Sequence, residues 1–310
     1  MITFCVKLLL LTLGLFSFVF AQEFCQSWGA SEKRGELNVA INESSGLSNS
    51  LMFAERLYHS NDSWNSGPKF FLSNLQGKAT QEIQLDVDVT LIPTIDVEDM
   101  DVGPCGEESC IFLADIGDNS SKRAGIHILL TPELEVWEQP VSPRVLNITY
   151  PDRPHDAEAF AVHPNGDLYI LTKEISPFKT SPARLYRLPL GVWLQDREAY
   201  TLEFVTTLDV RALSGSSVDI FSHIVTGMDI SSDGQRLLVL TYGEVFELLL
   251  DLSTLPSDSV LPANLPYKKI EVITLLQQES ISYLAEGYGF LYAAETKAES
   301  SPIMQMSCKK

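Results

Sequence analysis

A short pattern of polar and apolar positions recurs five times along the chain. Each copy is a polar residue followed by alternating apolar positions, and the copies span residues 43–47, 98–102, 158–162, 226–230 and 279–283. A second apolar run follows each copy, and the dipeptides Asn165-Gly166 and Asp233-Gly234 stand between the two runs in two repeats. These dipeptides favour the positive φ angles of tight turns between antiparallel strands. The pattern therefore predicts a β-hairpin in every repeat.

The spacing of the copies predicts the architecture. Repeats of this length are typical of folds in which each unit buries its apolar face against its neighbours. No long stretch with helical periodicity is present to connect parallel strands, so we expect an all-β fold. Five copies favour a five-bladed β-propeller, with six blades as the alternative because compact blades need only about 40 to 45 residues. Only a strand near residues 303–306 remains for the last blade, so we expect residues 37–41 to complete it and close the ring.

The first 21 residues are typical of a secretory signal peptide. Lys7 precedes an apolar run over residues 8–20, and Ala21 is followed by the polar Gln22. A membrane anchor is the alternative, but the run is short for a bilayer span. We expect a signal peptide over residues 1–21, a single β-propeller domain over residues 22–310, and a secreted, extracellular protein.

Cysteine usage agrees with an extracellular chain. Four cysteines remain after residue 21, and of the three possible pairings we favour Cys105 with Cys110 and Cys25 with Cys308. Free thiols or a zinc site are the alternative, but the paired short spacings of a structural zinc motif are missing.

Sequons for N-glycosylation begin at four positions, Asn42, Asn61, Asn119 and Asn147. Asn147 is the best candidate for a glycan because it lies in an expected outer strand. A glycan at any of the other three would cover one end of the predicted channel.

The chain carries a formal net charge of −19 at pH 7. Nucleic acids and anionic membrane surfaces attract basic patches, so neither is an expected partner. We expect a monomer whose partner is a small molecule or a glycan.

The hairpins predict a polar end and a plain end of the propeller. In an antiparallel pair the end of the second strand lies beside the start of the first, so the polar segments after the second strands should adjoin the leading residues of the copies. The opposite end is expected to carry ordinary turns. The leading residues, which should meet around the axis, are Glu43, Glu98, Glu158, Thr226 and Glu279.

Carboxylates that gather around one axis repel one another unless a proton or a cation relieves the repulsion. Calcium is abundant outside cells and accepts six to eight oxygen ligands. We therefore predict Ca²⁺ as the cofactor, bound by the five leading residues directly or through water. The alternative is that the glutamates pair with Lys173, Arg123 or water and hold no ion.

Residues 115–119, Asp-Ile-Gly-Asp-Asn, form a second candidate at the same end. Their oxygens could chelate calcium or orient a ligand, although the full EF-hand pattern is missing. Equally, the side chains could bond to their own backbone in an Asx-type turn.

Two main functions and one further alternative remain open. The first is a calcium-dependent hydrolase of a small ester or phosphorylated substrate, in which a metal-bound water reacts with the help of a general base. Its catalytic residues would be Asp62, Asp118, His155 and Lys173. Its substrate-binding residues would be Asn61, Asp115, Asn119, Arg123, Glu174 and Tyr242. We also expect Asp229 near this end.

The second function is a non-catalytic extracellular binding module in which calcium holds the blades together. A separate alternative is glycan recognition through Trp64 and Tyr242 at the polar end, although single aromatic side chains are more often part of the core. No nucleophilic serine motif, paired zinc histidines or glycine-rich phosphate loop occurs in the sequence.

Seven short motifs between residues 40 and 295 are the basis of a resemblance to known proteins. They are Glu43-Ser-Ser-Gly, Asn61-Asp-Ser, Glu98-Asp-Met, Asp115-Ile-Gly-Asp-Asn, Asp156-Ala-Glu-Ala, Thr172-Lys-Glu and the segment 226–234. With these motifs the chain resembles a widespread group of secreted, mostly bacterial propeller proteins of unassigned activity. That resemblance implies a fold and no reaction.

A more distant resemblance rests on the segment 43–47, on Leu57-Tyr58 and Asn61-Asp62, and on the Glu279 phrase. In these the chain resembles the calcium-activated nucleotidases, or apyrases, which are five-bladed propellers with a calcium ion on the axis. The resemblance implies that the five leading residues bind the ion. That family's Asp-Asp-Arg-Thr-Gly phrase is here Asn-Asp-Ser-Trp-Asn, and the basic residues expected to hold a polyphosphate are missing.

Overall fold

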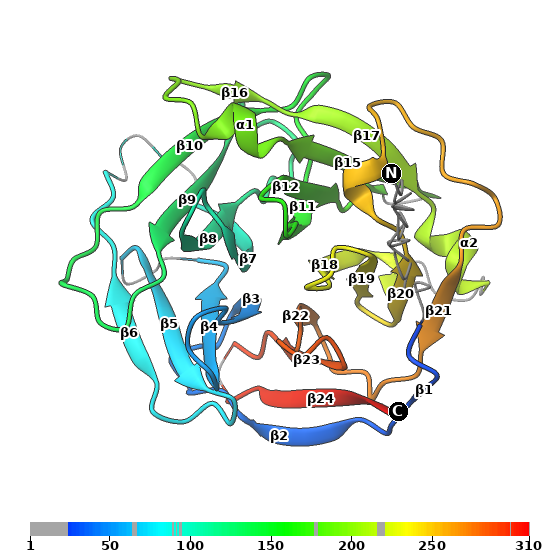
Figure 1. The fold of residues 1–310 in the computed structure, drawn as a ribbon, viewed down its shortest axis with the longest axis horizontal. Helices are drawn as coiled ribbons and strands as arrows, with labels where there is room; N and C mark the ends of the chain where they lie inside the picture. The colour runs from blue at the N-terminus through cyan, green and yellow to red at the C-terminus, as the bar shows by residue number, and fades with distance from the viewer. Residues whose placement is uncertain are drawn as a thin grey trace, which may run out of the picture.

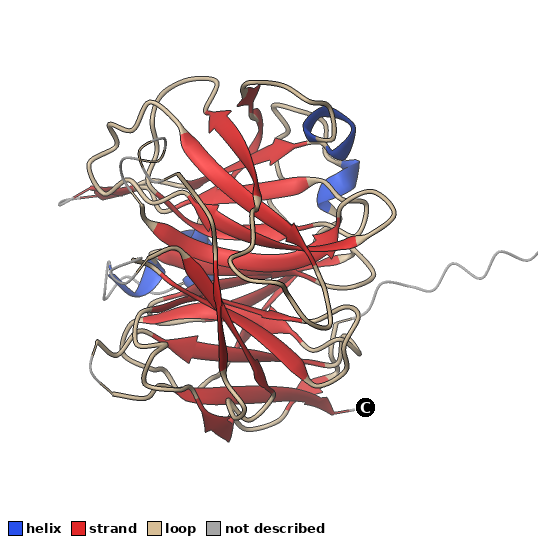
Figure 2. Ribbon diagram, turned by 90° about the vertical axis from the view of Figure 1, so that its left-hand side faces the viewer, coloured by secondary structure: helices blue, strands red, loops and turns tan. Residues whose placement is uncertain are grey.

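The computed structural model of the chain describes residues 24–309, apart from residues 64–66, 89, 91, 93–94, 177–178, 216–220 and 298. Five sheets surround a central axis (Figure 1), which confirms the predicted five-bladed β-propeller. Seen from the side, the strands run between two faces that loops cover (Figure 2). The predicted signal peptide and Trp64 lie outside the described residues.

The blades follow one another in chain order, and each begins with its innermost strand. Blade 1 contains β3 (Ser44–Asn49), β4 (Arg56–Asn61), β5 (Lys69–Asn74) and β6 (Gln81–Gln84). Blade 2 contains β7 (Val97–Pro104), β8 (Ser109–Asp115), β9 (Ile126–Pro132) and β10 (Arg144–Thr149), to which β16 (Tyr200–Thr201) adds in parallel. Blade 3 contains β11 (Ala157–Val162), β12 (Leu168–Thr172), β15 (Ala183–Leu188) and β17 (Glu203–Leu208). Blade 4 contains β18 (Val225–Ile230), β19 (Arg236–Thr241), β20 (Val245–Leu249) and β21 (Tyr267–Ile270).

Blade 5 combines both ends of the chain. Its C-terminal strands are β22 (Gln278–Tyr283), β23 (Gly289–Ala294) and β24 (Pro302–Lys309), and its N-terminal strands are β1 (Ser27–Trp28) and β2 (Glu32–Glu36). In the part of the chain that the structure describes, the connections also contain the short hairpin β13 (Ile175–Ser176) and β14 (Lys179–Thr180) and four short helices. The helices are α1 (Leu190–Trp193), α2 (Val210–Ser214), η1 (Phe221–His223) and η2 (Leu252–Thr254).

The predicted hairpins are confirmed, because the first strand of every blade pairs with the second in antiparallel register. Gly166 and Gly234 occupy the turns with φ of 86° and 72°, the left-handed conformation that a glycine adopts without strain. Apolar clusters fill the spaces between neighbouring blades. Phe112 of blade 2 and Phe160 of blade 3, for example, lie with ring centroids 6.2 Å apart.

The closing strand is not the one expected. The N-terminus does complete the last blade, but through β1 and β2, which both pair with β24, and not through residues 37–41. Strand β2 is the outermost strand of its blade and is largely exposed, so it has a charged sequence without an apolar signature. Leu37 and Ile41 follow it and are buried in the core instead. Both favoured disulfides are present, and Cys25 joins Cys308 across this seam.

The innermost strands line the channel. Each of the strands β3, β7, β11 and β18 lies against the inner strand of the next blade, and β22 returns to β3. These five strands therefore form a closed ring around a common axis (Figure 1).

Candidate functional site

Every inner strand begins with a β-bulge, where its pairing with the second strand shifts by one residue. A bulge redirects the side chain of the extra residue. The residues at this position, which we call the bulge ring, are Ser45, Glu98, Glu158, Thr226 and Glu279. Because the inner strands form a closed ring, these residues surround one end of the channel, which we call the acidic mouth.

Four of the five predicted leading residues belong to the bulge ring, and Glu43 does not. Glu43 precedes β3, and Ser45 occupies the bulge of blade 1. In the first repeat, the residue equivalent to the other glutamates is therefore Ser45, two residues after the predicted Glu43. Glu43 nevertheless lies at the acidic mouth, where its carboxylate accepts a hydrogen bond from Ser63 and its charge acts on Asp62.

The two hydroxyl residues of the bulge ring connect blades. Ser45 Oγ donates to the Val97 carbonyl of blade 2 at 2.6 Å, and Thr226 Oγ1 donates to the Gln278 carbonyl of blade 5 at 2.8 Å. Both hydroxyls are fully buried. Thr226 therefore has a structural partner in addition to its predicted role as a metal ligand.

The three glutamates of the bulge ring gather around one lysine. Lys173, which follows β12, forms an ion pair with Glu158, and its charge partly offsets the rise that burial causes in the pKa values of Glu98 and Glu279. All three glutamates are at least nine-tenths buried. The Lys173 ammonium also lies 5.9 Å from the ring centroid of Tyr242. The predicted alternative pairing of the glutamates with Lys173 is thus present at Glu158.

Negative charge remains in excess at the acidic mouth. Burial and the neighbouring Asp96 raise the pKa of Glu98 well above its usual range, and the Asp96 carboxyl hydrogen-bonds to Glu98. Two carboxyl groups in contact must share a proton or a cation. Gly117 makes room for this pair, because a Cβ at Gly117 would lie 2.4 Å from Asp96 Oδ2 and 2.5 Å from Glu98 Oε1.

Two further carboxyl groups have pKa values near neutrality. Burial and the charge of Glu295 raise the pKa of Glu279 to about 7, and Tyr242 donates a hydrogen bond to Glu279 at 3.2 Å. Burial and the charge of Glu43 raise the pKa of Asp62 to about 6. Asp62 Oδ1 is buried without a hydrogen-bond partner among the described residues, and so is Glu158 Oε2.

The 115–119 loop is held by its own side chains. Asp115 is fully buried, pairs with Arg123, and lies 2.7 Å from His127 Nδ1. Asp118 accepts a hydrogen bond from the Arg123 backbone at 2.6 Å, whereas Asn119 is exposed. The Arg123 guanidinium also bonds to the Gly117 carbonyl at 2.8 Å, so its donors are directed into the loop.

His155 lies in a separate buried network. Its Nδ1 is 2.6 Å from a Glu174 oxygen, and its Nε2 is 2.7 Å from the Tyr186 hydroxyl and 3.1 Å from Asp152. Both ring nitrogens therefore have protein partners. Asn61, the remaining predicted ligand contact, donates to the Ala40 carbonyl at 3.0 Å.

The acidic mouth has the oxygen donors that calcium uses, but they do not form a coordination shell. Within the described part of the chain, no group of three or more His, Cys, Asp or Glu side chains is arranged to hold a metal ion. The Lys173 ammonium provides the positive charge beside the glutamates. Carboxylate oxygens such as Glu158 Oε2 have no hydrogen-bond partner among the described residues, so the donor set suits a hard cation.

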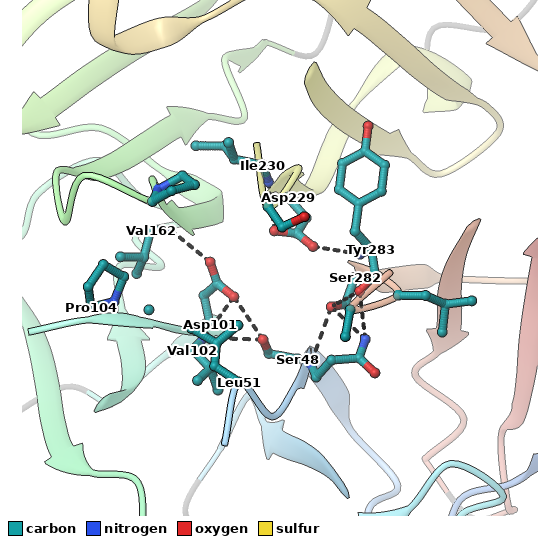
Figure 3. Close-up of a pocket in the computed structure, with 16 residues that line it drawn as sticks. Ser48, Leu51, Asp101, Val102, Pro104, Val162, Asp229, Ile230, Ser282 and Tyr283 are labelled. Carbon is teal, nitrogen blue, oxygen red and sulfur yellow. Dashed lines mark hydrogen bonds between the residues drawn. The ribbon is translucent and has the colours of Figure 1, made fainter. Parts of the chain in front are cut away.

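The opposite end of the channel carries more than ordinary turns. It contains a cavity of about 250 Å³ that the ends of all five inner strands line (Figure 3). Asp229 belongs to this cavity and not to the acidic mouth, and Asp101 faces it from β7. Both aspartates lie three residues after the bulge, a shared position that a comparison of the repeats could have revealed.

No family model and no curated protein matches the chain. Among solved structures, it is similar to a streptogramin B lyase, with 10% identity, 93% of this chain and 100% of that chain covered, and a TM-score of 0.44. A nidogen/laminin complex gives 12% identity, 83% and 74% coverage and a TM-score of 0.46. Hydrazine synthase from Kuenenia stuttgartiensis gives 11% identity, 84% of this chain and 95% of that chain covered, and a TM-score of 0.45. Likeness at this level carries no information about activity.

Among the residues that the structure describes, no helix has both the length and the apolar character required to cross a membrane. The two disulfides are compatible with an extracellular protein.

Proposed function

We propose that this chain is a secreted, calcium-binding β-propeller whose ion site is the acidic mouth. The observation that carries the proposal is the position of three buried glutamates, Glu98, Glu158 and Glu279, at the same bulge in three different blades. A divalent cation at this level would neutralise carboxylates that now share one lysine. It would also connect blades that are far apart in sequence.

Calcium suits the donors better than a softer metal. It prefers carboxylate, hydroxyl and carbonyl oxygens and accepts them in irregular arrangements. The buried Glu158 Oε2, which has no partner among the described residues, is one available donor. Lys173 competes with the ion, so binding requires its ammonium to move away from Glu158.

Isothermal titration calorimetry with CaCl₂, after treatment with EGTA, tests the proposal. Glu158→Gln should weaken calcium binding at least tenfold, whereas Lys173→Met should strengthen it, because the competing ammonium is gone. Glu203→Gln, in the outer strand β17, is the matched control and should bind like the unmodified protein. At calcium concentrations 100 times Kd, thermal unfolding should show about 2.7 kcal/mol of stabilisation.

Equal affinity in the Glu158→Gln and unmodified proteins would contradict the site. Weaker binding after Lys173→Met would contradict the competition. Absence of any calcium heat in the unmodified protein would refute the proposal.

A second candidate function is calcium-dependent hydrolysis, which one observation favours. Asp62 combines a pKa near neutrality with a buried oxygen that has no partner among the described residues, as a general base requires. Panels of nucleotides, phytate, lactones and aryl esters, with calcium or with chelator, test this function. Calcium-dependent turnover that Asp62→Asn abolishes, with calcium binding retained, would support an enzyme. No turnover in any panel, together with a melting temperature that chelator lowers, would favour a binding module.

A further inference from the structure

The cavity at the channel end opposite the acidic mouth has an apolar wall and a polar interior. Its wall includes Leu51, Pro104, Val162, Ile230 and Leu284, one from each of the five blades, at the ends of the inner strands or in the loops that follow them (Figure 3). Leu51 is 56% exposed and stands at the opening. A cavity of about 250 Å³ lies just below the range of drug-sized ligands, so it suits a smaller molecule.

Two buried carboxylates face this cavity from different blades. Asp101 lies on β7 and Asp229 on β18, and both are only 7% exposed. No lysine or arginine in the described part of the chain forms an ion pair with either of them. Burial raises the pKa of Asp101 to about 6 and that of Asp229 well above its usual range, and the charge of Asp101 contributes to the second shift. The two carboxylates therefore interact electrostatically.

Both carboxylates are held in place by backbone N–H groups. Asp101 accepts hydrogen bonds from Val102 N and Val162 N, each at 2.7 Å, and from Ser48 Oγ at 2.8 Å. Asp229 accepts from Ile230 N and Tyr283 N, each at 2.6 Å. The bonds to Val162 and Tyr283 cross to the next blade.

These bonds do not exhaust the acceptors. A carboxylate has about four lone-pair sites, so each aspartate retains acceptor capacity in a fixed position. The Ser282 hydroxyl lines the same cavity and hydrogen-bonds to Asp229. The cavity thus presents preorganised acceptors beneath an apolar wall.

We propose that this cavity binds a small organic monocation, a primary ammonium that carries an apolar group. Its three N–H donors match the remaining acceptors of Asp101 and Asp229 and a serine hydroxyl, and its apolar group packs against the wall. Anions would be repelled by the two carboxylates. A bare metal ion would leave the apolar wall without a partner.

The probe is benzylamine, which is cationic at pH 7, and its comparison compound is benzyl alcohol, a neutral molecule of similar shape. Titration calorimetry of the full mature chain should show benzylamine binding at least tenfold more tightly than benzyl alcohol. Asp229→Asn should weaken benzylamine binding at least tenfold. Because that variant also loses an inter-blade acceptor, its folding must be confirmed by circular dichroism.

A second pair of variants avoids the buried network. Leu51→Lys adds a tethered ammonium at the exposed opening and should abolish benzylamine binding, whereas Leu51→Met should retain it. Glu158→Gln, at the acidic mouth, should leave benzylamine binding unchanged whether or not calcium binds there.

Three outcomes would overturn the proposal. Equal affinity for benzylamine and benzyl alcohol would show an apolar cavity without charge selection. Unchanged benzylamine binding in Leu51→Lys would place the ligand elsewhere. Displacement of benzylamine by CaCl₂ in the unmodified protein, but not in Glu158→Gln, would assign the amine to the acidic mouth.

Discussion

The residues of the bulge ring do two different things at equivalent positions. Ser45 and Thr226 donate hydrogen bonds to the carbonyl of the next blade, a bond that an ionised glutamate cannot donate. The glutamates have other partners: Glu98 bonds to the Asp96 carboxyl group of its own blade, Glu158 pairs with Lys173 of its own blade, and Glu279 accepts a hydrogen bond from Tyr242 of blade 4.

Thr226→Val tests the neutral connection, because valine has the same shape and no donor. Both the hydroxyl and its acceptor at Gln278 are fully buried, so we expect a loss of about 1 to 2 kcal/mol in the free energy of unfolding, measured by urea denaturation. Thr207→Val, on the exposed face of β17, is the control and should change stability by less than about 0.5 kcal/mol. Equal effects of the two substitutions would contradict the role of Thr226.

Asp101 should make stability depend on pH. Its pKa is about 6 in the folded protein, above that of an unfolded aspartate, so the folded state binds its proton more tightly. The contribution of Asp101 to stability is therefore fully present at low pH, where its carboxyl group is protonated. The free energy of unfolding should fall by up to about 3 kcal/mol as the pH rises from about 4 to above 6. Urea midpoints at pH 4.5 and 7 measure the change. Asp101→Asn should flatten the profile, and an unaltered slope would contradict this assignment.

At the scale of elements, the closeness of the inner strands limits which residues they can contain. A Cβ at Gly46 of β3 would lie only 2.5 Å from the Met100 backbone nitrogen of β7. Gly46→Ala should therefore separate these strands and cost about 2 kcal/mol in the free energy of unfolding. Gly191→Ala is the control, since a Cβ there meets nothing within 4 Å, and alanine should be neutral or slightly stabilising in that short helix. Equal stability of the two variants would contradict close packing between β3 and β7.

The inner hairpins could be predicted from sequence because both of their strands are buried, and because the turn contains Asn-Gly or Asp-Gly in two repeats. An outermost strand whose side chains are nearly all exposed could not, since it has no apolar pattern. Strand β2, with the sequence Glu-Lys-Arg-Gly-Glu, is an example. The apolar Leu37 and Ile41 that follow it indicated a closing strand over residues 37–41, but they are buried in the core outside any strand.

The candidate sites were predictable to a similar extent. Repetition placed Glu98, Glu158 and Glu279 together, because equivalent positions in a propeller face one axis. The role of Asp101 and Asp229 was hidden, because only the closed ring shows that each carboxylate bonds to the backbone of the next blade.

At the scale of the whole molecule, stability depends on closing the ring between the two ends of the chain. Strands β1 and β2 pair with β24, and the Cys25–Cys308 disulfide covers the same seam with a sequence separation of 283 residues. The Cys105–Cys110 disulfide spans a separation of 5 residues. A cross-link stabilises the folded state by restricting the unfolded chain, and this restriction grows with the length of the closed loop.

Replacing both cysteines of the long-range disulfide by serine should therefore cost more than the same replacement in the local one. Loop entropy gives about 6 kcal/mol for Cys25→Ser with Cys308→Ser and about 2 kcal/mol for Cys105→Ser with Cys110→Ser. Urea unfolding of both double variants under non-reducing conditions measures the difference. Limited proteolysis should also cleave the first variant near β1 and β2, because these strands are then held by β-sheet pairing and side-chain packing alone. Equal losses in the two variants would mean that those contacts, and not the covalent link, determine closure.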